Sequence, residues 1–196
     1  MLDCLDVAKY FIIRSHESGR EDTITNMKVQ KLLYYAQSLH LALFDEPLFE
    51  QEIQAWRYGP VCPVAYSFYS GFEANQLPIP SPEILESIPN SQKEVLDEVW
   101  QYFGEYHAYS LSGLTHLEFP WKKARKGLHP NAPSQEQISQ QDMRLLGLKK
   151  LEEIEEAHPS YPQIIAHLLK QTFSTNTEPK YVKQGEASDW LNSLLT

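Results

Sequence analysis

The chain has 196 residues, 42% hydrophobic and 22% charged, which are the proportions of a globular domain and exclude a disordered chain. Its formal net charge of −9 argues against non-specific binding to nucleic acid, which requires clustered Lys and Arg side chains. Two cysteines without a CxxC pair predict neither a zinc site nor a disulfide framework, and no apolar run approaches the ~20 residues of a membrane span, so we expect a cytoplasmic protein.

The longest helical pattern covers residues 26–44 and follows a predicted helix over residues 3–15 and a polar loop. Thr25 or Asn26 is suited to cap its first turn, and the residue before Pro47 avoids the α conformation, which ends the helix. Apolar residues recur along one stripe of this helix. The side chains that we expect off the stripe or at its edge, with at least one tyrosine hydroxyl in solvent, are Lys28, Lys31, Tyr34, Tyr35 and Gln37.

Residues 52–57 alternate between polar and apolar side chains, a pattern that predicts a short strand. Tyr58–Pro60 is predicted to form a turn. Pro63 suits the first turn of a following helix, where its missing N–H costs nothing. A short strand needs a partner, and residues 135–138 are one candidate.

In the second half of the chain, four prolines within residues 75–89 predict an ordered excursion without a long element. Ser91–Glu94 matches a capping box that would open the next helix. Ser110 or Ser112 is predicted to cap the helix after it, and Ser139 the last helix before residue 158.

These elements predict a mostly α fold: a single helical domain over residues 1–158 with a minor, short two-stranded β element. Residues 159–196 are predicted to form a C-terminal helical extension, because short amphipathic segments alternate there with polar linkers. Gly-rich phosphate motifs of the forms GxxxxGK and GxGxxG are absent.

Cys62 follows a Gly-Pro turn where a strand is predicted to meet a helix, and a thiolate at a helix N-terminus is activated. It could therefore act as a nucleophile with His116 or His40 as its base, which would make the protein a hydrolase. The alternative is a small buried residue, the more common role of an isolated cysteine. The histidines show no HxxxH or HExxH spacing, so we predict no metal site and no cofactor.

One basic run stands beside Trp121, and its members are Lys122, Lys123, Arg125 and Lys126. Such a run could bind phosphate, which would make the protein a DNA-binding regulator of its own operon. The alternative is a solvated face at the end of a helix, where positive side chains complement the helix dipole. The net charge favours this alternative.

Two segments carry a resemblance to a known family. The first is NMKVQKLLYYAQSLHLALFDEPLFEQEIQAWRYGPV, and the second is SLSGLTHLEFPWKKAR. In order and spacing they closely resemble the Panacea domain family, the SocA-like antitoxins that include phage-associated GepA proteins. The matching positions that we expect to act as scaffold include Lys28, Leu32, Tyr34, Tyr35, Trp56, Tyr58, Gly59, Pro60, Thr115, His116 and Trp121.

The resemblance implies a mostly helical domain that serves as the antitoxin of a two-gene toxin–antitoxin system and neutralises its toxin by direct binding. Family partners are varied, and some are alarmone-synthetase-like enzymes. It carries over no catalytic residue, so we expect a binding protein rather than an enzyme, with a toxin encoded by the adjacent gene as its partner and its oligomeric state open. The residues of the extension that we predict to bind the partner are Tyr161, Phe173, Tyr181 and Trp190.

Overall fold

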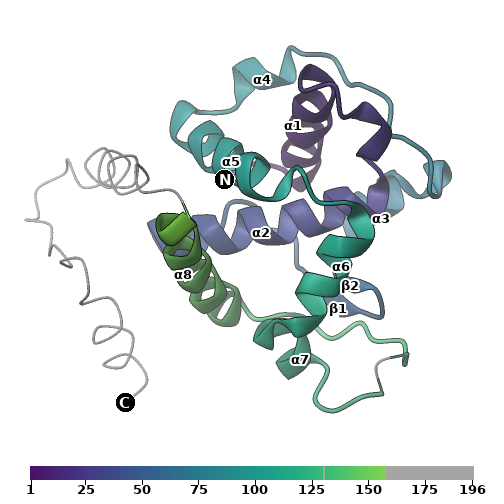
Figure 1. Cartoon of the computed structure of the whole chain (residues 1–196), viewed down its shortest axis with the longest axis vertical. Helices are drawn as coiled ribbons and strands as arrows, with labels where there is room; N and C mark the ends of the chain where they lie inside the picture. Colours follow the sequence, from purple (N-terminus) through teal and green to yellow (C-terminus); the bar gives the residue numbers. More distant parts are fainter. Residues whose placement is uncertain (130, 158–196) are drawn as a thin grey trace, which may run out of the picture. The chain divides into compact units, whose positions relative to one another are not determined.

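The structure is a computed structural model that describes residues 1–129 and 131–157 (Figure 1). It is mostly α with one two-stranded antiparallel sheet, which confirms the predicted fold class. In chain order the elements are α1 (Cys4–Glu17), η1 (Glu21–Thr23), α2 (Asn26–Phe44), β1 (Gln54–Trp56), β2 (Gly59–Val61), α3 (Pro63–Phe68), η2 (Ser70–Phe72), α4 (Ile84–Ser87), α5 (Asn90–Phe103), α6 (Ala108–Leu117), α7 (Phe119–Ala124) and α8 (Gln140–Ala157). The predicted extension over 159–196 lies outside the described residues.

Helix α2 forms the centre of this fold. Figure 1 shows it passing between α1 and α5 on one side and α6, α7 and the β hairpin on the other, with α8 packed against it. Thr25 caps its first turn as predicted, accepting a hydrogen bond from the backbone N–H of Lys28. The helix ends at Phe44 because Asp45 adopts a left-handed conformation, with φ of 57°.

The polar side chains of α2 are buried, so the prediction that they lie off the apolar stripe in solvent is wrong. Packing on all sides leaves Lys28, Lys31 and Gln37 no more than 1% exposed, and both Tyr34 and Tyr35 are fully buried. The polar groups of Lys28, Lys31, Tyr35 and Gln37 each reach an oxygen or N–H of the fold instead. Gln37, for example, accepts from the backbone N–H of Leu48 and donates to the carbonyl of Phe49. Helix periodicity cannot detect such satisfied polar groups.

Strands β1 and β2 form a hairpin, and Ala55 pairs with Pro60 at its centre. The turn is therefore Arg57–Tyr58, one position earlier than predicted, and Gly59 begins the return strand with φ of 101°. Residues 135–138, the candidate partner from the sequence, lie on the other edge of β1. The N–H of Ala55 donates to the carbonyl of Glu136 there, at 2.8 Å.

Of the three helix starts predicted later in the chain, one is confirmed and two are wrong. Ser139 accepts a hydrogen bond from the N–H of Asp142 in the first turn of α8, as predicted. The capping box at Ser91 is wrong because α5 begins earlier, after Pro89, and α6 is capped by His107 rather than by Ser110 or Ser112. Helix α5 starts at Asn90, directly before Ser91, and α6 starts at Ala108, before both Ser110 and Ser112.

Helix α8 is fixed to α2 and to the junction between α6 and α7. A Cβ at Gly147 would collide with the backbone of Ser38, so the two helices approach as closely as a glycine permits. At the junction, Glu118 accepts from the hydroxyl of Tyr35 at 3.0 Å and pairs with Lys150 at 3.4 Å. Over the described residues, no helix combines the length and the apolar character needed to cross a bilayer.

Candidate partner-binding groove

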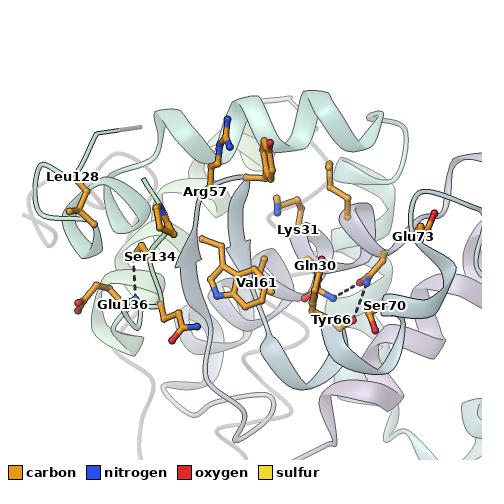
Figure 2. A pocket seen from close by; sticks show the side chains of 16 residues that line it. Gln30, Lys31, Arg57, Val61, Tyr66, Ser70, Glu73, Leu128, Ser134 and Glu136 are labelled. Atoms are coloured by element: carbon orange, nitrogen blue, oxygen red, sulfur yellow. Dashed lines mark hydrogen bonds between the residues drawn. The ribbon is translucent and has the colours of Figure 1, made fainter. Parts of the chain in front are cut away.

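A groove of about 850 Å³ opens beside the N-terminal end of α2. Figure 2 shows the side chains that line it, which come from the first turns of α2, the β hairpin, α3, η2 and the segment 128–136. A volume in this range is sufficient to enclose several side chains of a binding partner or a small molecule. The groove is the candidate site among the described residues.

A chain of hydrogen bonds between amides fixes the floor of the groove. Gln30 donates to the side-chain oxygen of Asn26 at 2.9 Å, and Asn26 donates to the carbonyl of Tyr66 at 3.1 Å. Gln30 in turn accepts from the backbone N–H of Cys62 at 2.9 Å. These contacts tie α2 to α3 and satisfy buried amide groups, so this part of the floor is rigid and complete.

Lys31 is the charged residue of the floor, and its side chain is 1% exposed. Its ammonium donates to the carbonyl of Pro60 at 3.0 Å. Burial lowers the pKa of this ammonium to about 7. Gly59 makes room for it, because a Cβ there would lie 2.7 Å from Cε of Lys31 and 2.6 Å from Oγ1 of Thr115. The glycine in the first family motif therefore allows a lysine and the hairpin to share this space.

Aromatic side chains form the rim of the groove. Trp56 and Tyr66 meet edge to face with ring centroids 4.9 Å apart, and the guanidinium of Arg57 lies 5.0 Å from the ring centroid of Tyr58. The prediction that Tyr58 packs inside as scaffold does not describe this arrangement, because its side chain is 56% exposed at the hairpin turn. Residues of this kind are typical anchors of protein interfaces.

The second family motif holds the hairpin from the other side. Ser112 of α6 donates to the carbonyl of Tyr58, and Trp121 of α7 donates to the carbonyl of Trp56, each at 2.9 Å. Two backbone carbonyls of the hairpin, on either side of Arg57, are thus bound by α6 and α7, which links the second motif to the first.

His116 itself packs against Trp121, with ring centroids 4.3 Å apart. Burial and the nearby charges of Lys31 and Arg125 lower its pKa, so the ring is neutral at pH 7. This environment suits a structural histidine.

The hypothetical nucleophile Cys62 is not paired with either of the histidines predicted as its base, His116 and His40. Its thiol is fully buried and hydrogen-bonds with Cys4, and this hydrogen bond together with burial raises the pKa of Cys4. His116 packs on Trp121, and the Nδ1 of His40 lies 2.7 Å from the carbonyl of Glu46. The Cys–His pair that a hydrolase of this type requires is therefore not assembled.

The basic run is divided by the fold. Arg125 is 2% exposed and donates to the carbonyls of Ala55, His129 and Ala132, so it faces inward. Lys123 pairs with Asp142 at 2.8 Å. The hypothesis of a four-residue phosphate-binding patch fails at Arg125, because an arginine that binds backbone carbonyls is not presented to DNA. Within residues 1–129 and 131–157, no three His, Cys, Asp or Glu side chains are grouped as metal ligands.

Burial divides the residues of the predicted scaffold set, in which Tyr58 is exposed and Trp56 and His116 are half-buried. The members of the predicted set that are buried are Lys28, Leu32, Tyr34, Tyr35, Gly59, Pro60, Thr115 and Trp121. The four partner-binding positions predicted in the extension, from Tyr161 to Trp190, lie outside the described residues. Sequence reasoning missed the groove and Lys31, and the one signal available was a lysine within an otherwise buried helix.

Comparisons with known proteins match the part of the chain that builds these features. Residues 29–122 match the family described as antitoxin SocA-like, Panacea domain. Antitoxin SocA of Caulobacter vibrioides (strain NA1000 / CB15N) is 43% identical over 47 residues, which are 24% of this chain and 25% of that protein. The match thus spans about a quarter of the length of SocA. No solved structure matches the chain. Residues 29–122 thus carry a Panacea domain of the SocA-like kind.

Proposed function

We propose that this protein is an antitoxin that neutralises a cognate toxin by direct binding, and that the groove beside α2 is part of the binding surface. The observation that carries the proposal is that the groove is built mainly by the matched domain. Its floor and aromatic rim, from Gln30 to Glu73, fall within the family match over 29–122. A segment that identifies a family of antitoxins therefore also supplies the concave surface.

The chemistry of the rim supports protein binding. Stable interfaces bury roughly 1,200–2,000 Å² and depend on a few aromatic or arginine anchors. Tyr58 and Tyr66 are 56% and 39% exposed, and Arg57 stacks on Tyr58 at the hairpin turn. Arg57 and Tyr58 stand at the turn of a hairpin whose backbone α6 and α7 bind, and Tyr66 stands on α3, which Asn26 of α2 binds. We therefore expect these side chains to be ordered before a partner arrives, so that binding requires little loss of their conformational freedom.

The experiment is co-expression with the product of the adjacent gene, which we expect to be a toxin. Alarmone-synthetase-like enzymes are one of the varied toxin types that the family resemblance allows. Growth should be rescued by the wild-type protein, and the two proteins should co-purify. Tyr58→Ala should weaken the complex at least tenfold. Tyr109→Ala is the matched control, because Tyr109 is 70% exposed but does not line the groove. A non-toxic neighbour, or toxicity that persists beside the wild-type protein, would refute the proposal.

The extension is the second surface that we propose for partner recognition. Removing residues 159–196, with Tyr161, Phe173, Tyr181 and Trp190, should abolish neutralisation while the circular dichroism and thermal unfolding of residues 1–158 remain those of a folded domain. An unfolded product would refute the domain boundary. A folded product that still neutralises would assign recognition to the groove alone.

A variant also tests the hydrolase alternative. Cys62→Ala removes the thiol, and because Cys62 is buried against Cys4 we expect neutralisation to continue unchanged. Loss of neutralisation by a variant that still folds and still binds the toxin would restore the catalytic hypothesis.

A further inference from the structure

Lys31 combines three properties that a purely structural lysine does not need. It is 1% exposed, it lines an open groove, and its hydrogen bond is to one backbone carbonyl, that of Pro60. A lysine ammonium has three donor hydrogens. No carboxylate among the described residues forms a salt bridge with it. A buried positive charge without a negative partner is unfavourable for the free protein.

Lys28, one helical turn earlier on α2, gives the contrasting case. Its ammonium donates to the carbonyl of Gly104 at 2.7 Å and to the hydroxyl of Thr23 at 3.0 Å, and it lies 5.4 Å from the ring centroid of Trp100. It does not line the groove. The fold can therefore enclose a lysine of α2 with several partners, and it does not do so for Lys31.

Holding Lys31 in place also requires an unusual backbone. Gly59 has φ of 101°, a conformation that other residues rarely adopt, and it lies directly against Cε of Lys31 and Oγ1 of Thr115. A methionine or leucine at position 31 would fill the same space without a buried charge. The lysine is thus unfavourable for packing alone, and unfavourable polar groups in the lining of a cavity are typical of binding sites.

The charges around the groove define what Lys31 can bind. Figure 2 shows Lys31 and Arg57 in the central part of the lined surface, with Glu73 and Glu136 towards opposite sides of it. Both glutamates are exposed. A ligand with a negative charge at its centre and positive charges on either side would complement this arrangement.

We propose that Lys31 binds the side-chain carboxylate of an Asp or Glu in an internal segment of the toxin that lies along the groove, with basic residues of that segment facing Glu73 and Glu136. The inference rests on the proposed function and identifies the chemistry of its contact. The carboxylate accepts from the donor hydrogens of Lys31 that Pro60 leaves unused. The aromatic rim covers the segment and excludes water from the ion pair.

The test measures binding of the full-length protein to the purified product of the adjacent gene. Lys31→Met keeps the volume of the side chain and removes its charge, and we expect the dissociation constant to rise at least about 30-fold, the effect of truncating one member of a buried charge pair. Lys28→Met is the matched control, and its dissociation constant should change less than about threefold after both variants are checked for folding.

The partner carboxylate is then located by substituting each Asp and Glu of the toxin with Asn or Gln. One such toxin variant should bind the wild-type antitoxin at least about 30-fold more weakly, yet bind Lys31→Met no more weakly than the wild-type toxin does. Wild-type binding that is unaffected by Lys31→Met would overturn the inference and leave the proposed function standing. Coupling of Lys31 to the C-terminal carboxylate of the toxin would also overturn it. Absence of any complex would instead refute the proposed function.

Discussion

Two lysines on α2 sit in opposite kinds of site. The closed site consists of Lys28 with Thr23, Trp100 and Gly104, and there the ammonium has two oxygen acceptors and an aromatic ring. The open site consists of Lys31 with Gly59, Pro60 and Thr115. There the ammonium has one acceptor among the described residues, and the side chain lines the groove. Burial alone therefore does not assign a role to a charged residue. The number of partners and access to a cavity separate structural lysines from candidate binding lysines.

The largest expected effect concerns the backbone of the open site. Gly59→Ala should lower the free energy of unfolding by about 4 kcal/mol, because it adds a left-handed alanine and a clash with Lys31 and Thr115. Urea unfolding measures the change. Gly113→Ala on α6 is the control, since a Cβ at Gly113 meets nothing within 4 Å and the substitution should stabilise the helix slightly. Equal effects of the two substitutions would show that Gly59 is not needed to accommodate Lys31.

We expect substitution of the lysine in the closed site to lower the stability of the protein. Lys28→Met should lower the free energy of unfolding by about 2 kcal/mol, because it leaves the carbonyl of Gly104 without a donor inside the protein. Chemical denaturation at pH 7 provides the measurement. A stable Lys28→Met variant would mean that the two sites differ less than their contacts indicate.

The pH dependence of stability distinguishes the sites further. Burial lowers the pKa of Lys31 to about 7, and burial together with the charge of Arg20 lowers that of Lys28 to about 8. Both values lie below the unfolded value of about 10.4, so the unfolded chain binds more protons and the free energy of unfolding rises with pH. The Lys31 contribution should approach 1.4 kcal/mol per pH unit between pH 7 and about 9.5. At higher pH, buried tyrosines such as Tyr35, whose pKa burial raises, oppose the trend.

Denaturation series of the methionine variants test this assignment. Lys31→Met should flatten the rise from pH 7 upward, whereas Lys28→Met should flatten it only from about pH 8. A profile that neither variant changes would contradict the lowered pKa values of both lysines.

The smallest expected effect has the opposite sign. Lys31→Met should raise the free energy of unfolding at pH 7 by about 1 kcal/mol, because it removes a buried charge that has no carboxylate partner. Thermal or urea unfolding at pH 7 is sufficient to detect it. A more stable variant that binds its toxin more weakly would be the signature of a residue kept for binding. Destabilisation comparable with that of Lys28→Met would place Lys31 among the structural lysines.

The sequence predicted the fold better than the site, and the reason is visible on α2. Apolar spacing located this helix, and local signals located Thr25 and Asp45 at its two ends. The same spacing placed Lys31 and Gln37 outside the core, because periodicity treats every polar residue as solvated. Their burial depends on acceptors far away in the chain, at Pro60 and Phe49, which no local pattern contains.

The candidate site depends on long-range contacts to an even greater extent. Resemblance to a family identified the hairpin residues, yet it did not separate Tyr58, which is exposed at the turn, from Pro60, which is buried beside it. That distinction follows from the register of the hairpin and from the hydrogen bonds that α6 and α7 make to it. The partner of a short strand and the contents of a groove are set by tertiary structure.

Arg125 has a consequence for how this domain can diversify. It holds the segment 128–136 through the carbonyls of His129 and Ala132, and it holds the hairpin through the carbonyl of Ala55. Because every one of these acceptors is a backbone atom, the attachment does not depend on which side chains the segment carries. One wall of the groove can therefore change its sequence while its path stays fixed. Under the proposed function, substitutions on this wall would change the surface offered to a toxin while α2 and the hairpin stay intact.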